Sequence, residues 1–256
     1  ALVTMCDRNL GRILEAMDRY DLWKDTLLIV NTDHGFLLGE HGWWAKCVMP
    51  FYNEIAHIPL FVWDPRSGRA GVRASSLVQT IDLAPTILEF FGIPPTPDMQ
   101  GVPLRETIAR DAPVREAGLF GIFGGHVNVT DGRYVYMRGP VGDNEPLNEY
   151  TLMPTHMRNL FTPEELRPAT MGPPFTFTKG VPVMRIPAVT PQNRDLLVRE
   201  LKTMLFDLQG DPYQERPLRD ETIERTMIAH LVRLMRANDA PLEQYERLGL
   251  DPHKGE

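Results

Sequence analysis

The sequence has little cysteine, no long apolar run and no excess of positive charge. Its two cysteines, Cys6 and Cys47, are too few for a disulfide framework, and we expect both to be free thiols. No stretch of about 18 consecutive apolar residues occurs, which argues against a membrane-spanning helix. The net charge is −7 at pH 7 and like charges are not clustered, so the basic face that binds nucleic acids is missing. We therefore predict no disulfide scaffold, no membrane span and no nucleic-acid partner.

What is present is the composition of an ordinary globular protein. Apolar residues make up 43% of the 256 and charged residues 24%, enough for one large domain or a main domain with a smaller satellite. The chain starts at Ala1 without a methionine, in a segment that already has the pattern of a helix. We interpret it as part of a longer protein. Any signal peptide would lie upstream, so the sequence does not distinguish a cytoplasmic protein from a periplasmic or secreted one.

The first part of the chain has the pattern of an α/β domain. Apolar residues recur at helical spacing over residues 2–17, and short apolar runs at 27–32 and 58–63 have the length of buried strands. A further helix begins after Asp82, which we expect to cap it. Non-alternating strands separated by helices indicate a mostly parallel sheet with helices on both faces. Such sheets bind ligands at the carboxyl ends of their strands, where residues 31–34 would lie.

The second part of the chain has a different pattern. Asp131 and Gly132 lie between two β-rich runs, which predicts a hairpin. Residues 140–195 are rich in proline and methionine and lack periodicity, so we expect a long irregular insertion. One more strand and a terminal amphipathic helix follow. We therefore predict an α/β domain over residues 1–112 and a small α+β subdomain with an antiparallel sheet over residues 113–256.

An acid and an imidazole stand side by side at the end of the first predicted strand, as Asp33 and His34. A carboxylate oxygen and an imidazole nitrogen can bind one divalent cation, and Gly35 permits the turn that lets both side chains converge. Two ligands do not complete a metal site, so others would have to come from elsewhere. In the alternative interpretation, Asp33 caps a turn and His34 bonds to the loop backbone. The spacing alone leaves both interpretations open.

Three more side chains nearby have the chemistry to bind an anion. The ammonium of Lys46 suits a tetrahedral oxyanion such as sulfate or phosphate, although a lone lysine is also an ordinary surface residue. His41 and His57 would either donate to the same anion or satisfy local backbone groups. These three residues are the candidates for substrate binding.

The region around these residues resembles the sulfatase family of the alkaline phosphatase superfamily. Family members carry a strand, Asp-His-Gly or Asp-Asn-Gly, Gly-x-His-Gly, an aromatic residue, a lysine, Tyr-Glu and a strand that begins with Val/Ile-Pro. The matching segment here is "TLLIVNTDHGFLLGEHGWWAKCVMPFYNEIAHIPLFVWDP". Three further segments resemble the family in the same order, namely "VQTIDLAPTILEFFGIPPTPDMQGVPL", "DGRYVYMR" and "LFDLQGDPYQERPL".

The resemblance implies a metal-dependent sulfuric ester hydrolase acting on a small-molecule or glycan sulfate ester. It makes Asp33 and His34 ligands of a catalytic cation, with Ca2+ expected first and Mn2+, Mg2+ or Zn2+ as alternatives. It makes Lys46 the catalytic residue that holds a sulfate oxygen and offsets charge on the leaving oxygen. Residues 1–112 would be the C-terminal part of the catalytic domain.

Three elements of the family pattern are missing from the sequence: the nucleophile motif, an early Asp-Asp metal pair and a mid-domain Lys-x-His segment. Sulfatases carry a formylglycine nucleophile in Cys-x-Pro-x-Arg or Ser-x-Pro-x-Arg, and neither motif occurs here. The resemblance places this segment upstream of Ala1, so we expect a sulfatase fragment that is inactive alone and that self-associates through exposed sheet edges. The alternatives are a phosphonate or phosphodiester hydrolase of the same superfamily and a noncatalytic anion-binding homologue.

Overall fold

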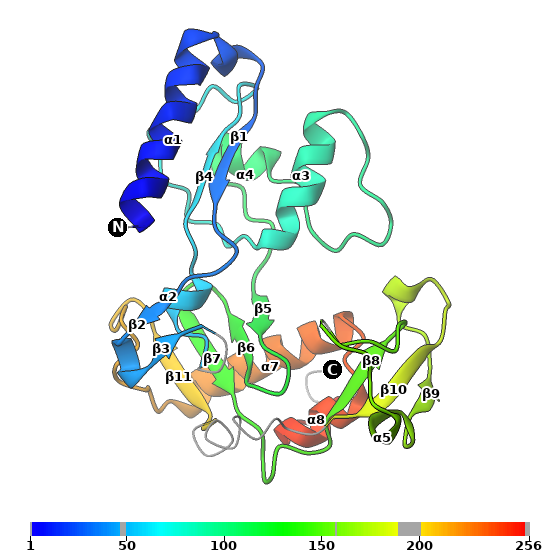
Figure 1. Ribbon diagram of the computed structural model, residues 1–256. Coiled ribbons are helices and arrows are strands. Elements are labelled where there is room, and N and C mark those ends of the chain that lie inside the picture. Colours follow the sequence, from blue (N-terminus) through cyan, green and yellow to red (C-terminus); the bar gives the residue numbers. More distant parts are fainter. Residues whose placement is uncertain (1, 47–49, 157, 189–200, 254–256) are drawn as a thin grey trace. The chain divides into compact units, whose positions relative to one another are not determined.

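A computed structural model describes residues 2–46, 50–156, 158–188 and 201–253 (Figure 1). The chain divides into two compact units. Unit 1 contains residues 1–33 and 58–115, and unit 2 contains residues 34–57 and 116–256. In the described part of the chain, no helix is long and apolar enough to cross a bilayer. Of the two cysteines, Cys6 is a free, exposed thiol, and Cys47 lies outside the described residues.

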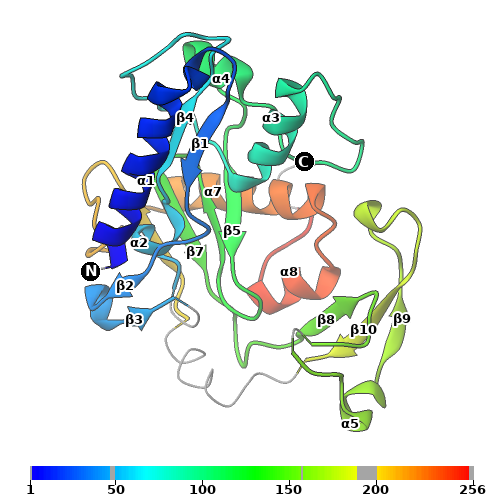
Figure 2. The same cartoon turned by 45° about the horizontal axis from the view of Figure 1, so that its top comes forward.

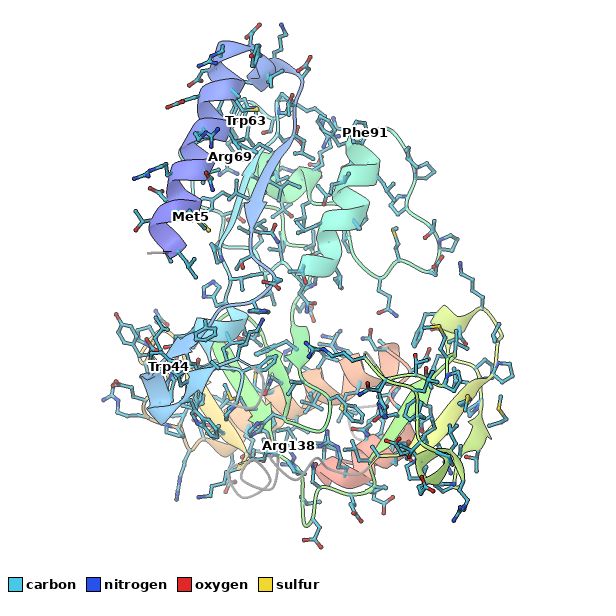
Figure 3. The ribbon with its side chains drawn as sticks, viewed as in Figure 1. Met5, Trp44, Trp63, Arg69, Phe91 and Arg138 are labelled. Carbon is cyan, nitrogen blue, oxygen red and sulfur yellow. The ribbon has the colours of Figure 1, made fainter. Side chains whose placement is uncertain are left out.

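Unit 1 contains the predicted helices and strands of the first part of the chain. Its elements are α1 (Leu2–Arg19), η1 (Leu22–Lys24), β1 (Leu28–Asn31), β4 (Leu60–Trp63), η3 (Thr80–Asp82), α3 (Leu83–Phe90) and α4 (Arg105–Arg110). The prediction of an amphipathic first helix is confirmed, and Met17 is its buried residue. At the end of β4, Trp63 (labelled in Figure 3) donates its indole N–H to the carbonyl of Trp23 at 2.9 Å.

The prediction of a mostly parallel sheet is wrong for the described residues. Strands β1 and β4 pair antiparallel, with Leu28 opposite Trp63 and Asn31 opposite Leu60. The chain therefore leaves β1 and enters β4 at the same end of the pair, and the intervening residues do not cross over a sheet face. Every other strand pair in the described residues is also antiparallel. The observed class is a mixed α/β structure with small antiparallel sheets.

The side chain of Asp82 has a different role from the predicted helix cap. Helix α3 forms where predicted, but the fully buried Asp82 carboxylate makes no cap bond to it. It accepts instead from the backbone N–H groups of Gln79 (2.8 Å) and Val102 (2.9 Å). Arg115 also binds both carboxylate oxygens, at 2.5 Å each. One buried carboxylate thus joins three separate segments of unit 1.

Unit 2 is built on an antiparallel sheet of four strands in the order β11-β7-β6-β5. The strands are β5 (Gly118–Gly121), β6 (Val127–Thr130), β7 (Tyr134–Arg138) and β11 (Met204–Asp207). Thr130 pairs with Val135, which confirms the predicted hairpin at Asp131 and Gly132. Helix α7 (Glu221–Ala237) lies across one face of this sheet (Figures 1 and 2), and α8 (Leu242–Leu248) follows it. The predicted terminal amphipathic helix is confirmed as α7.

The two faces of this sheet bury different partners. Tyr136 and Leu205 belong to the core shared with α7 and α8. Their neighbours in sequence point to the opposite face, as strand geometry requires. There, Val135, Met137 and Phe206 pack with Leu37, Tyr52 and Ile55. The second core therefore fixes the segment of residues 34–57, which carries most of the predicted site, to a rigid sheet.

The predicted insertion has more regular structure than its sequence indicates. Residues 140–195 contain β8 (Asn148–Thr151), α5 (Pro163–Leu166), β9 (Thr170–Gly172), η4 (Thr176–Thr178) and β10 (Val183–Pro187). The strands form an antiparallel sheet in the order β8-β10-β9. Strands of three to five residues are too short to show a hydrophobic period, which explains why we predicted an irregular segment.

Unit 2 also buries an arginine and a histidine side chain. Arg247 donates to the carbonyl of Gly125 (3.1 Å) and to the side-chain oxygens of Asn144 (2.7 Å) and Gln244 (2.9 Å), and burial lowers its pKa to about 10. The Nε2 atom of His126 bonds to the carbonyl of Lys202 at 2.9 Å, while its buried Nδ1 has no partner among the described residues. Burial is the main cause that lowers the pKa of His126, and the charge of Arg247 lowers it further.

We expect His126 to make the stability of the protein depend on pH. Because its folded pKa lies below the unfolded value of about 6.5, the unfolded state binds more protons as the pH falls. The contribution of the neutral His126 ring to the free energy of unfolding is complete above about pH 6.5. It is lost on acidification, and the free energy of unfolding then falls by at most about 1.4 kcal/mol per pH unit. Urea unfolding between pH 8 and 5 should show this slope in the wild type and a smaller one in His126→Gln. Equal slopes would contradict the assignment.

Candidate active site

A short hairpin brings the predicted metal ligand and the predicted catalytic lysine together. Strands β2 (Leu37–Leu38) and β3 (Trp44–Ala45) pair antiparallel, with Leu37 opposite Ala45. Residues that precede β2 therefore meet those that follow β3. The turn between them is the short helix η2 (Glu40–Gly42). Trp44 is exposed at this hairpin (Figure 3).

The ring of His34 is held between a backbone carbonyl and an ammonium. Its Nδ1 lies 2.9 Å from the carbonyl oxygen of Gly35, and because a carbonyl only accepts, Nδ1 carries the proton. Its Nε2 accepts a hydrogen bond from Lys46 Nζ. The Gly35 carbonyl thus fixes the tautomer in which Nε2 carries the one in-plane lone pair of the ring. That lone pair accepts from Lys46 Nζ in this structure, and it can bind a metal only when the ammonium moves away. Two of the sequence candidates, His34 and Lys46, are thus in contact.

Gly35 packs directly against the backbone of helix α2 (Asn53–Ala56). Its N–H donates to the carbonyl of Ile55 at 2.9 Å, and the next N–H, of Phe36, donates to the carbonyl of Glu54 at 3.1 Å. A Cβ atom at position 35 would lie 1.6 Å from the Glu54 carbonyl oxygen. Glycine is therefore required here by close backbone approach rather than by an unusual φ angle.

We expect Gly35→Ala to lower the free energy of unfolding by at least about 2 kcal/mol, because the added methyl forces the loop off α2 and breaks both backbone bonds. Urea unfolding measures the change. Gly11→Ala is the matched control: its Cβ would meet nothing within 4 Å, and alanine favours the interior of α1 by about 0.5–1 kcal/mol. If position 35 tolerates alanine as well as position 11 does, the described packing is incorrect.

His41 and His57 occupy different environments. The His41 ring stacks on Tyr52, with ring centroids 3.6 Å apart, and its Nε2 lies 3.3 Å from a carboxylate oxygen of Glu54. The His41 side chain is only 10% exposed, which makes it a well-anchored group. His57 is exposed at the end of α2, where its backbone N–H donates to the carbonyl of Asn53. A substrate-binding role for either residue stays a prediction.

Ala45, the residue before Lys46, has a backbone conformation that alanine rarely adopts. Its φ angle is +95°, a region that favours glycine. A non-glycine residue in such a region costs about 1–3 kcal/mol and persists only where its surroundings enforce it. The pairing of Leu37 with Ala45 provides that constraint. The strain therefore fixes the backbone direction from which Lys46 extends.

Asp33 and His34 supply chemically suitable but incomplete ligands for a cation. Asp33 is exposed, and one of its carboxylate oxygens lies 3.3 Å from the hydroxyl of Thr32. A carboxylate oxygen and an imidazole Nε2 fit Ca2+, Mn2+ or Mg2+ in part and Zn2+ equally well. Within the described residues, no group of three or more His, Cys, Asp or Glu side chains is placed to hold a metal ion. The two donor types fit a divalent cation, the other ligands would have to come from elsewhere, and a metal-binding role for Asp33 and His34 stays a prediction.

Two structurally important residues near the site were not predicted from the sequence. Tyr52 forms the stacking partner of His41 and belongs to the core beneath the hairpin. Gln214 is buried and accepts the backbone N–H of Asn53 at 2.7 Å, which ties the start of α2 to a segment 161 positions away. No pattern in the sequence indicates a bond over that separation. For Tyr52, the sequence offered its aromatic character and its place in the segment that resembles the family pattern.

Comparison with known proteins identifies sulfatase-like sequence in a part of the chain that includes Lys46. A family model described as N-sulphoglucosamine sulphohydrolase, C-terminal, matches residues 39–123. An N-acetylglucosamine-6-O-sulfatase of Bacteroides thetaiotaomicron is 34% identical over 111 residues, which are 43% of this chain and 20% of that protein. Human arylsulfatase K is 36% identical over 104 residues, 41% of this chain and 19% of that protein. The chain thus matches about a fifth of the length of these relatives.

Solved structures match almost the whole chain. BT4656, solved in complex with its substrate D-glucosamine-2-N,6-O-disulfate, aligns with a TM-score of 0.58 and 18% identity over 99% of this chain and 41% of its own. A phosphonate monoester hydrolase of Silicibacter pomeroyi aligns with a TM-score of 0.57 and 19% identity over 91% of this chain and 39% of its own. At these identities the structures establish a shared fold, and the sequence relatives establish the family. The chain belongs to the sulfatase family of the alkaline phosphatase superfamily and corresponds to its C-terminal region.

Proposed function

We propose that this chain is the C-terminal part of a metal-dependent sulfuric ester hydrolase. The observation that carries the proposal is the contact between His34 and Lys46, in which the Gly35 carbonyl fixes the ring tautomer. A cation ligand and an ammonium at one point are what binding of a sulfate group requires, because the two positive charges act on the same oxyanion. The sulfatase relatives support the reaction class.

Four residues of the chain have specific roles in this proposal. Asp33 and His34 would hold one side of a divalent cation, which we propose is Ca2+, and the cation would supply a Lewis acid for the sulfate oxygens. Lys46 donates to a sulfate oxygen and offsets negative charge on the leaving alcohol oxygen. His41, anchored by Tyr52 and Glu54, contributes a ring nitrogen toward the substrate.

The attacking group would come from outside residues 1–256. The sequence contains neither Cys-x-Pro-x-Arg nor Ser-x-Pro-x-Arg, the motifs in which sulfatases form formylglycine. In the full-length protein, residues 1–112 would complete the catalytic domain and residues 113–256 would form its C-terminal subdomain. The compact units place residues 34–57 with the second part of the chain, so the hairpin would be supported by the subdomain sheet.

The substrate class that we propose is a sulfate ester of a sugar. Support comes from the relative that is an N-acetylglucosamine-6-O-sulfatase and from the similar structure that binds D-glucosamine-2-N,6-O-disulfate. The second candidate is a phosphonate or phosphodiester hydrolase. It is favoured by the fold shared with a phosphonate monoester hydrolase and by an Asp-His pair and lysine that suit either tetrahedral anion. A noncatalytic anion-binding homologue is the third.

Parallel assays of the full-length protein with 4-methylumbelliferyl sulfate, glucosamine 6-sulfate and a phenyl phosphonate ester distinguish these candidates. We expect sulfate-ester turnover to exceed phosphonate turnover, and the 256-residue chain alone to hydrolyse none of them. Faster phosphonate hydrolysis would favour the second candidate. No turnover, together with an upstream sequence that lacks the formylglycine motif, would favour the third.

A further inference from the structure

Unit 2 contains a cavity of about 340 Å³ beside the candidate active site. Two aromatic residues of its wall, Trp43 and Tyr52, come from the segment that carries the site, and two cationic residues, Lys202 and Arg219, come from the chain around β11. The remaining wall is mainly apolar and is formed by Pro50, Thr203, Met204, Leu205, Pro217 and Leu218. The cavity therefore combines flat aromatic surface with positive charge.

Backbone hydrogen bonds fix the positions from which the two cations extend. The carbonyl of Lys202 accepts from His126 Nε2 at 2.9 Å. The N–H of Leu218, next to Arg219, donates to the carbonyl of Leu205 at 2.7 Å. The segments that carry Lys202 and Arg219 are thus held side by side at the start of β11. The two side chains are exposed and can both reach a bound anion.

The aromatic wall is shared with the candidate active site. Tyr52 is buried and stacks on His41, and Trp43 lies three residues before Lys46 and packs against the core that contains Tyr52. A ligand in the cavity therefore touches the hairpin that positions Lys46. This continuity links the cavity to the substrate rather than to a separate ligand.

We propose that this cavity is a subsite for an anionic sugar residue that neighbours the sugar carrying the reactive sulfate. The volume accommodates one sugar ring, whose C–H face packs on an aromatic ring, and the two cations bind its sulfate or carboxylate. This inference rests on the proposed function, because it assigns the second part of the same substrate. It makes the protein selective for charged oligosaccharides over monosaccharide or aryl sulfates.

The test compares a small substrate with a charged one in the full-length protein. We expect the double variant K202Q/R219Q to lower kcat/KM for a 6-O-sulfated disaccharide with a uronate or sulfated neighbour by about 10–100-fold, mainly through KM. Two charge-assisted bonds to the neighbouring sugar are lost, and solvent screening at these exposed side chains limits the loss. Turnover of 4-methylumbelliferyl sulfate should stay within twofold. Arg225→Gln, which removes an exposed cation from α7 outside the cavity, should change neither. A disaccharide with a neutral neighbour should also be unaffected by the double variant.

Direct binding separates failure of the subsite from failure of the proposed reaction. Calorimetric titration with a uronate-containing disaccharide and with an N-sulfated disaccharide, both lacking the 6-O-sulfate, needs no turnover. We expect binding of at least one of them to the wild type and to Arg225→Gln, and loss of binding in K202Q/R219Q. The relative affinities identify whether sulfate or carboxylate is preferred. Absence of binding to the wild type, or equal binding by wild type and double variant, would overturn the subsite even if sulfate esters are hydrolysed.

Discussion

Replacing Lys46 by alanine in the full-length protein is expected to lower kcat for an aryl sulfate by about 10²–10³-fold, the loss seen when one donor to a developing oxyanion is removed. The lysine is positioned by the β2–β3 hairpin, by the strained φ of Ala45 and by its contact with His34 Nε2. Because the hairpin is formed before substrate binds, the ammonium is already placed beside the candidate metal ligand. It would pass from His34 Nε2 to a sulfate oxygen when a cation takes the Nε2 lone pair. Its removal should therefore affect the chemical step more than the fold.

Two comparisons make this result specific to Lys46. Lys24→Ala removes a lysine that is 65% exposed and paired with Asp21, and it should leave kcat unchanged. Urea unfolding of Lys46→Ala should match the wild type to within about 0.5–1.5 kcal/mol, the contribution of the one hydrogen bond that this half-buried side chain makes to His34. A kcat that falls less than about fivefold while the protein remains folded would remove Lys46 from the proposed machinery.

The largest effect on stability is expected at the buried pair of Arg115 and Asp82. We predict that Arg115→Ala lowers the free energy of unfolding by about 3–5 kcal/mol, the usual cost of leaving one partner of a buried ion pair without the other. The Asp82 carboxylate is fully buried and also accepts two backbone N–H groups, so it cannot turn toward water without breaking them. The loss should appear as a shift of the urea midpoint.

The control for this pair is an exposed one in the same unit. Arg110 and Glu106 form an ion pair four residues apart on α4, with side chains 72% and 58% exposed. Arg110→Ala should cost about 0.3–0.5 kcal/mol, as expected for exposed helix pairs. Similar costs at the two arginines would show that Asp82 is better solvated than described.

The parts of the fold that could be predicted are those with local causes. Helices α1 and α7 have long amphipathic patterns, and the hairpin at Asp131 and Gly132 has turn residues between β-rich runs. The direction of the strand pair β1–β4 could not be predicted in the same way. An apolar run in the sequence indicates that a strand is buried on both faces, but not whether it runs parallel or antiparallel to its neighbour. That direction depends on the path of the residues between β1 and β4, and these residues pack on the four-stranded sheet of unit 2.

For the candidate site, the sequence predicted residues but not their contacts. The spacing and the family resemblance indicated His34 and Lys46, and a twelve-residue separation that contains a hairpin brings their side chains together. The role of Asp82 was assigned wrongly, because its partners Val102 and Arg115 are 20 and 33 residues away. The hydrogen bond from the Asn53 backbone to the Gln214 side chain could not be predicted from the sequence either. Long-range polar contacts leave no periodic pattern in a sequence.

The proposed reaction requires Asp33 and His34 to share one cation beside Lys46. Diffraction from crystals of the full-length protein with bound vanadate or sulfate, including anomalous data for the metal, tests this directly. We predict one cation within about 2.0–2.6 Å of both an Asp33 carboxylate oxygen and His34 Nε2, with Lys46 Nζ on an oxygen of the anion. A cation bound without these two residues, or an anion that Lys46 does not reach, would contradict it.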